Sequence, residues 1–115
     1  MRCSRRKTYD ALEVYINAEL FAADERRVEI VAQDIRRYLN CCWGVEQINV
    51  DTDDVEYNAE ADKECEGGIV NGTLRVHFYA YNCEVECTPF DILANVEDTI
   101  AALNPIRIST EYYKD

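Results

Sequence analysis

The sequence predicts an α+β fold in which a four-stranded antiparallel sheet carries two helices on one face. Three observations support this prediction. Apolar residues alternate with polar ones in several segments, as they do in strands with one buried face. Two other segments repeat their apolar residues every three or four positions, which is typical of amphipathic helices. The order along the chain is strand, helix, strand, strand, helix, strand.

The first strand and the first helix have the most regular patterns. Residues 11–20 alternate strictly, and their apolar positions are Leu12, Val14, Ile16, Ala18 and Leu20. Asp24 is a good helix cap, and Glu25 follows it where the positive end of a helix dipole favours an acid. Apolar residues then recur at helical spacing from Val28 to Cys42. We therefore expect a helix that begins after Asp24 and ends near Gly44.

The middle of the chain has a less regular pattern. Residues 45–58 form a second extended segment, which the acidic run from Asp51 to Asp54 is expected to interrupt. The pair Asn71-Gly72 is typical of a type I′ turn, so residues 69–74 are interpreted as a tight hairpin. Residues 74–83 form the third strand, whose apolar side consists of Leu74, Val76, Phe78 and Ala80.

The last helix and the last strand complete the pattern. Thr88 and Pro89 mark a helix start, because threonine caps helices and proline suits the first turn. The predicted buried stripe of this helix consists of Phe90, Leu93, Val96, Ile100 and Leu103. Residues 106–113 alternate again and form the fourth strand. The βαββαβ order is the ferredoxin-like plan, in which both helices cover one sheet face and the other face stays open.

A single domain accounts for the whole chain. Its 115 residues, 48% of them hydrophobic, suffice for one core and not for two. We expect residues 1–115 to form this domain, with residues 1–8 as a flexible basic tail. No apolar run reaches the roughly 18 residues of a membrane span, and the basic start lacks the apolar stretch of a secretory signal. A cytoplasmic location is therefore expected.

Acidic residues dominate the predicted surface. The chain holds 23 acidic and 12 basic residues, which gives a net charge of -11. Such a surface repels nucleic acid and anionic lipid and attracts basic protein grooves. The candidate partner-binding acids cluster in mid-chain and are Asp51, Asp53, Asp54, Glu56, Glu60, Asp62, Glu64 and Glu66. The alternative interpretation is that the acids serve solubility alone.

Aromatic residues are expected on the open face of the sheet. Tyr15 lies on the first strand, and Tyr79 and Tyr81 lie on the third; these two strands are central in the predicted topology. Similar aromatics stack bases in RNA-recognition domains, but acidic surroundings argue against RNA binding. Tyrosines are also favoured anchors in protein interfaces. We therefore predict that these three tyrosines contact a protein partner; the alternative is that a second subunit or the acidic loop covers them.

Few residues are suited to metal binding or catalysis. A zinc site from Cys83, Cys87 and either Cys65 or His77 is a minor alternative, because three residues rather than two separate the first pair. His77 is the sole histidine, and the chain has no glycine-rich phosphate or dinucleotide motif. We therefore expect neither enzymatic activity nor a cofactor.

Small size, strong acidity, absent catalytic motifs and a simple α+β fold together resemble the small phage-encoded inhibitors of host defence, the anti-CRISPR proteins and other DNA mimics. The resemblance lies in the profile of the whole chain, involves no motif and assigns no residues. It implies a non-enzymatic inhibitor in the host cytoplasm that occupies the basic, nucleic-acid-binding groove of a larger protein and binds neither nucleic acid nor membrane. The alternative hypothesis is a regulatory or assembly module that dimerises through its open sheet face, with a small ligand or zinc near His77.

Overall fold

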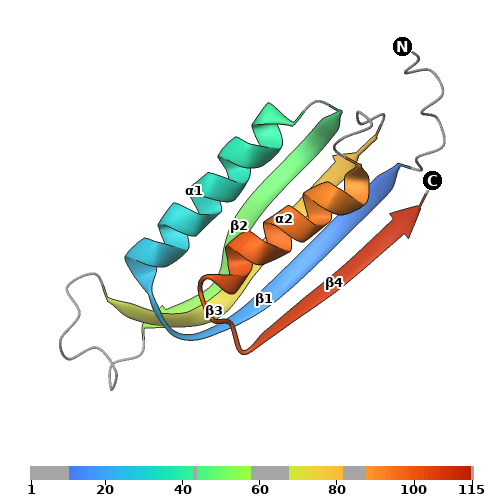
Figure 1. Ribbon diagram of the computed structural model, residues 1–115. Helices are drawn as coiled ribbons and strands as arrows, with labels where there is room; N and C mark the ends of the chain where they lie inside the picture. Colours follow the sequence, from blue (N-terminus) through green and yellow to red (C-terminus); the bar gives the residue numbers. More distant parts are fainter. Residues whose placement is uncertain (1–10, 43, 58–67, 82–87, 115) are drawn as a thin grey trace, which may run out of the picture.

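Four strands and two helices follow one another in the predicted order (Figure 1). The computed structural model describes residues 11–42, 44–57, 68–81 and 88–114, without the side chains of Asp54 and Tyr57. The predicted tail, residues 1–8, lies outside this part of the chain. The elements are β1 (Leu12–Asp24), α1 (Glu25–Cys41), β2 (Val45–Tyr57), β3 (Ile69–Ala80), α2 (Pro89–Ala101) and β4 (Arg107–Lys114).

The strands form one sheet in the order β2-β3-β1-β4, and every neighbouring pair is antiparallel. Both helices lie on the same face of this sheet, with α1 over β2 and α2 over the central strands (Figure 1). The predicted α+β class and ferredoxin-like topology are thereby confirmed. The long connections across the sheet place β1 and β3 at its centre and leave β2 and β4 as its two edges.

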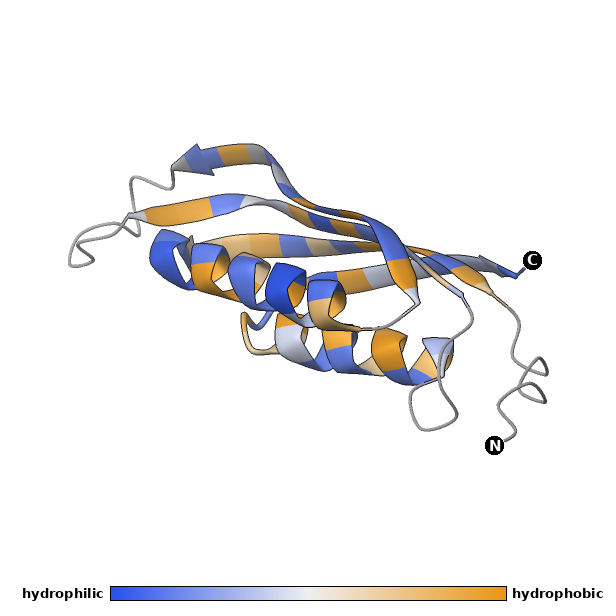
Figure 2. Cartoon of the chain, turned by 90° about the horizontal axis from the view of Figure 1, so that it is seen from above, coloured by the Kyte–Doolittle hydropathy of each residue, from blue (hydrophilic) through white to orange (hydrophobic). Residues whose placement is uncertain are grey.

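The hydrophobic core fills the space between the sheet and the helices. Hydrophobic and hydrophilic residues alternate along the strands (Figure 2), and the alternation sends every second side chain inward. The fully buried set includes Leu12, Val14, Ile16, Leu74, Val76 and Phe78 from the sheet and Ile35, Leu39, Ile92, Val96 and Ile100 from the helices. Among the described residues, no polar or charged side chain is buried. None of the described helices combines the length and apolar character that crossing a membrane requires.

Both helix starts follow the predicted capping chemistry. The side chain of Asp24 accepts a hydrogen bond from the Arg26 backbone N–H at 2.9 Å. Thr88 and Asp91 form a reciprocal capping box: the Asp91 N–H donates to Thr88 Oγ1 at 3.2 Å, and the Thr88 N–H donates to Asp91 Oδ2 at 3.1 Å. The first helix ends at Cys41, three residues before Gly44.

The predicted buried stripe of α2 is wrong at one position. Phe90 is 44% exposed, whereas Pro89 and Ile92 are buried. At the start of the helix, the buried side therefore contains Pro89 and Ile92 in place of the predicted Phe90. Phe90 instead contacts Tyr112 of β4 edge-on, with ring centroids 5.3 Å apart.

The predicted hairpin at Asn71-Gly72 is also wrong, because both residues lie inside the continuous strand β3. Gly72 allows β2 and β3 to approach each other closely and does not form a turn. A Cβ atom added to it would lie 3.0 Å from Val55 Cγ2 and 3.2 Å from the Asp53 carbonyl oxygen. The strand thus begins at Ile69, five residues before the predicted start.

The acidic run of β2 does not interrupt the strand, contrary to expectation. The strand is continuous from Val45 to Tyr57, with register shifts at Glu46/Asn49 and at Asp53/Glu56. Asp51, Asp53 and Glu56 are tolerated because they lie on the solvent side, while Val50 points into the core. An outward-facing carboxylate keeps its hydration and does not oppose strand formation.

Candidate functional site

The sheet face opposite the helices, hereafter the open face, contains the candidate site. Residues that are paired across antiparallel strands lie on the same face of the sheet. The buried residues of β1 and β3 face the helices, so the residues between them, and their partners on β2 and β4, belong to the open face. They include Glu13, Tyr15, Asn17 and Glu19 of β1; Thr73, Arg75, His77 and Tyr79 of β3; Glu46, Asn49, Asp51, Asp53 and Glu56 of β2; and Arg107, Ser109, Glu111 and Tyr113 of β4.

Acidic residues outnumber basic ones on the open face. Within the described residues it carries two arginines, Arg75 and Arg107, and seven acids: Glu13, Glu19, Glu46, Asp51, Asp53, Glu56 and Glu111. On the opposite face, α1 carries four arginines and three acids, and α2 carries three acids and no base. The open face therefore has five more acids than bases, whereas the two helices together have two more acids than bases.

Three of the predicted partner-binding acids are placed on this face. Asp51, Asp53 and Glu56 are all exposed. Asp53 forms an ion pair with Arg75 on the neighbouring strand, with 3.2 Å between Oδ2 and Nη2. The side chain of Asp54 and the candidates Glu60, Asp62, Glu64 and Glu66 lie outside the described part of the chain.

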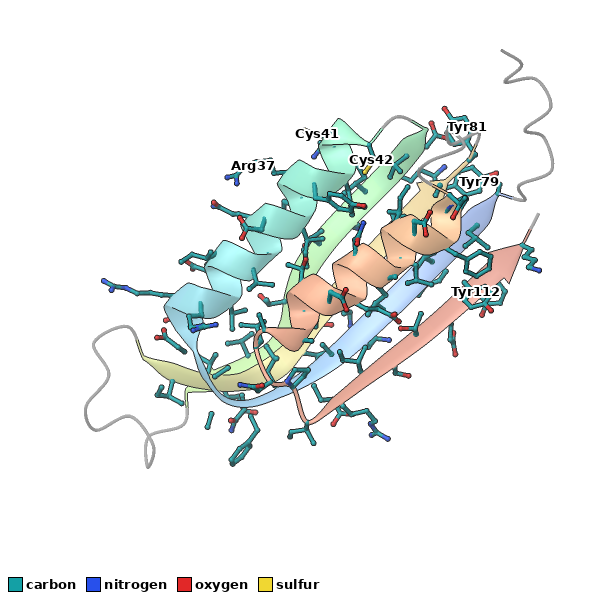
Figure 3. All side chains as sticks on the ribbon, viewed as in Figure 1. Arg37, Cys41, Cys42, Tyr79, Tyr81 and Tyr112 are labelled. Atoms are coloured by element: carbon teal, nitrogen blue, oxygen red, sulfur yellow. The ribbon has the colours of Figure 1, made fainter. Side chains whose placement is uncertain are left out.

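The three predicted tyrosines belong to two separate ring stacks. Tyr79 and Tyr81 stack on each other near the end of β3, with centroids 5.6 Å apart (Figure 3). Tyr15 stacks instead on His77, with centroids 4.4 Å apart and ring planes at 18°. Tyr15 and Tyr81 remain 38% and 37% exposed, so both offer surface for a contact.

A shared carboxylate holds the Tyr15–His77 stack. Glu13 Oε2 accepts a hydrogen bond from the Tyr15 hydroxyl at 2.8 Å and lies 3.2 Å from His77 Nε2. The hydrogen bond to Glu13 raises the pKa of Tyr15, and partial burial and the negative charge of Glu13 add to the rise. The stack is thus fixed by both aromatic contact and hydrogen bonding.

Tyr113 and Glu111 of β4 extend this cluster and were not among the predicted site residues. Tyr113 meets the edge of Tyr15 with centroids 6.1 Å apart. Its hydroxyl donates to Glu111 at 3.3 Å, and the charge of Glu111, with this hydrogen bond, raises the pKa of Tyr113. The alternation of residues 106–113 was the available signal, because it set both residues on the polar side of the last strand.

A shallow polar groove of about 450 Å³ crosses the middle of the open face. All four strands contribute to it, so its shape depends on the sheet rather than on a loop. Its polar lining consists of Tyr15, Asn17, Asn49, Asp51, Arg75, His77 and Glu111. Amides, carboxylates and an aromatic ring together suit a cationic or hydrogen-bonding side chain from a partner.

The zinc alternative finds no support in the described residues, where no group of three or more histidine, cysteine, aspartate or glutamate side chains is placed to hold a metal ion. His77 contacts Tyr15 and Glu13. Cys65, Cys83 and Cys87 lie outside this part of the chain. Cys41 ends α1 and is exposed, and Cys42 follows it and is partly buried (Figure 3).

Comparison with known proteins adds no assignment. No protein-family model matches the chain, and no curated protein matches its sequence. Among solved structures it is similar to LarC2, the C-terminal domain of a cyclometallase involved in the synthesis of the NPN cofactor of lactate racemase. The sequence identity is 11% and the TM-score is 0.45, and the match covers 91% of this chain and 57% of the LarC2 chain. It also matches a putative amidohydrolase/peptidase from Burkholderia cenocepacia, with 8% identity and a TM-score of 0.28 over 96% of this chain and 31% of that one. The chain thus spans little more than half of the LarC2 chain.

Proposed function

We propose that this protein is a non-enzymatic, acidic protein-binding inhibitor that docks its open face on a basic, nucleic-acid-binding groove of a larger protein. The observation that carries the proposal is the concentration of acids and exposed tyrosines on one sheet face. Carboxylates meet arginine and lysine side chains of the groove, and the tyrosines supply contact area with little loss of rotamer entropy. This mode of action is that of the anti-CRISPR and DNA-mimic class.

The number of acids on the open face limits how much of a DNA duplex the protein can imitate. A 13-residue strand such as β2 is about 43 Å long at roughly 3.3 Å per residue. Duplex DNA of that length carries about 25 phosphates, at one per roughly 1.7 Å. The seven described acids of the open face are far fewer. The proposed contact therefore blocks part of a groove and does not reproduce a whole duplex.

The alternative hypothesis, a dimer formed by two open faces, is opposed by the same charges. Two copies packed face to face would bring seven acids of one copy against seven of the other. Like charges in a desolvated interface cost several kcal/mol. A basic partner removes this penalty, and for that reason we favour it over self-association through this face.

Competition with nucleic acid tests the proposed function. A fluorescent DNA duplex bound to an arginine-rich peptide is titrated with the protein, and the anisotropy of the duplex is recorded. We expect displacement of the DNA at low salt and a steep loss of displacement as salt rises, because the contact is ionic. If the DNA stays bound at low salt with the protein in excess, the proposed function is wrong.

A further inference from the structure

The two edges of the sheet differ in how far they are protected against pairing with another strand. The edge strand β2 contains two register shifts, and Gln47 within it has a positive φ of 57°. Together with acids, such irregularities discourage edge-to-edge association. The edge strand β4 pairs with β1 in unbroken register from Arg107 to Lys114. Within the described residues, no strand pairs with its outer side.

Apolar surface next to this regular edge is also left uncovered. The helices lie over β2, β3 and β1, and β4 extends beyond them (Figure 1). Ile106 is 65% exposed, Tyr112 is 45% exposed, and Phe90, which contacts Tyr112, is 44% exposed. Phe90 lies on α2, Tyr112 lies on β4, and Ile106 directly precedes β4, so all three are beside the available strand edge.

The sequence of β4 is complementary to itself when two copies run antiparallel. A two-fold axis through Ser109 sets Arg107 opposite Glu111 of the second copy, and this ion pair forms twice. The same register sets Ile106 opposite Tyr112 of the second copy on the helix side, also twice. A register centred on Glu111 would instead oppose two carboxylates, which is unfavourable.

We propose that the outer edge of β4 is a homodimer interface, in which a second copy of this chain pairs antiparallel about Ser109. The occupant is a second copy because the charges and the apolar residues of one edge match those of the same edge after rotation. Arg107 bonds Glu19 through two of its nitrogens, at 3.1 and 2.8 Å. Its guanidinium has five N–H donors and so retains capacity for Glu111 of the second copy.

The dimer joins two four-stranded sheets into one sheet of eight strands. The axis is perpendicular to the sheet, so both open faces lie on the same side and the acidic surface doubles in length. This interface is the outer edge of β4, whereas the proposed function concerns the open face of a single copy; Arg107 and Glu111 belong to both. Because an eight-residue edge is only about 27 Å long, the contact is small and the dimer dissociates on dilution.

Cysteine cross-linking tests the register. In the Ser109→Cys variant the Cα atoms of the two substituted residues lie directly opposite each other, about 4.5–5.5 Å apart, which is within the range for a disulfide. In the Glu111→Cys variant the corresponding residues lie four positions apart along the edge, roughly 13 Å, which is too far. Both variants are oxidised with copper phenanthroline, and disulfide-linked peptides are identified by mass spectrometry, which separates them from links through native cysteines.

We expect a 109–109 disulfide in the first variant and no 111–111 disulfide in the second. Sedimentation velocity of the unmodified protein is expected to show a monomer–dimer equilibrium. Glu111→Arg should weaken the dimer about tenfold, since the lost pair occurs twice. Circular dichroism verifies that each variant is folded.

Three results would overturn the proposal: a monomer up to the solubility limit, a 111–111 disulfide that forms as readily as the 109–109 one, or a dimer that Tyr79→Ala dissociates and Glu111→Arg does not. The last result would assign dimerisation to the open face. None of these results bears on displacement of DNA from a basic peptide, so failure of the edge dimer and failure of the proposed function are distinguishable.

Discussion

Tyr15 and His77 stack directly across the two central strands of the sheet, with ring centroids 4.4 Å apart. Both side chains contact the same oxygen of Glu13, the Tyr15 hydroxyl at 2.8 Å and His77 Nε2 at 3.2 Å. The sole histidine of the chain is therefore part of a polar and aromatic cluster on the open face. The cluster also adjoins the groove that a partner side chain would enter.

The raised pKa of Tyr15 predicts a late phase in the alkaline titration of the protein. Its neutral hydroxyl donates to Glu13, so the folded state favours the protonated form. The stabilisation is complete below the pKa of tyrosine in the unfolded chain and is lost as pH rises through the higher folded pKa. Tyr113 also has a raised pKa and contributes to the late phase, so we expect Tyr15→Phe to reduce the late phase of the phenolate absorbance without removing it.

The Glu13→Gln variant tests whether Glu13 raises the pKa of Tyr15. It removes the charge that raises the pKa of Tyr15 and should move the titration of Tyr15 to lower pH. An alkaline titration that Glu13→Gln leaves unchanged would show that Glu13 does not hold the Tyr15 hydroxyl.

Two phenylalanines provide a matched test of the core. Phe78 of β3 is fully buried, whereas Phe21 of β1 is 60% exposed. We expect Phe78→Ala to lower the free energy of unfolding by about 3–5 kcal/mol, and Phe21→Ala to change it by less than about 0.5 kcal/mol. Urea unfolding followed by circular dichroism measures both. Equal losses in the two variants would contradict the described core.

Gly72→Ala tests the close approach of β2 and β3. The new Cβ would lie 3.0 Å from Val55 Cγ2 and 3.2 Å from the Asp53 carbonyl oxygen, so the strands must separate slightly. We expect a loss of about 1–3 kcal/mol in the free energy of unfolding. Thr73→Ala, at the next position of the same strand, is the control and should cost less. A Gly72→Ala variant as stable as the unmodified protein would show that β2 can move away freely.

Local signals predicted most of the fold. The strict alternation of β1, the helical spacing after Asp24 and the capping box at Thr88 each depend on residues close in sequence, and all three are present. The hairpin prediction failed because the sequence does not distinguish a glycine in a turn from one, such as Gly72, that makes room for a neighbouring strand. The position of Phe90 depends on Tyr112 of β4, which no local pattern reveals.

The sequence predicted those site residues whose sheet face follows from the alternation of polar and apolar residues within one strand. The period of two placed Tyr15 and Tyr79 on one side of their strands. It did not place Asp51 and Asp53, because the acidic run was expected to interrupt the strand that contains them. The contribution of Glu111 and Tyr113 depends on the register between β1 and β4, which are separated by most of the chain. The choice of His77 as the stacking partner of Tyr15 likewise results from the pairing of β1 with β3.

The central claim is that the position of the acids on the open face, and not the total charge, determines partner binding. Two double variants change the net charge equally: Asp51→Lys/Glu56→Lys on the open face and Asp34→Lys/Asp98→Lys on the helices. All four residues are exposed, and avoiding Asp53 preserves its ion pair with Arg75. The Debye length of about 8 Å at physiological salt screens charges on the far side of the domain.

The most direct measurement is the affinity of both variants for a fluorescent arginine-rich peptide at physiological salt, determined by anisotropy. We predict that the open-face variant binds at least about tenfold more weakly than the unmodified protein, whereas the helix variant stays within about threefold of it. Equal losses in the two variants would contradict the account, because binding would then follow net charge and not the open face.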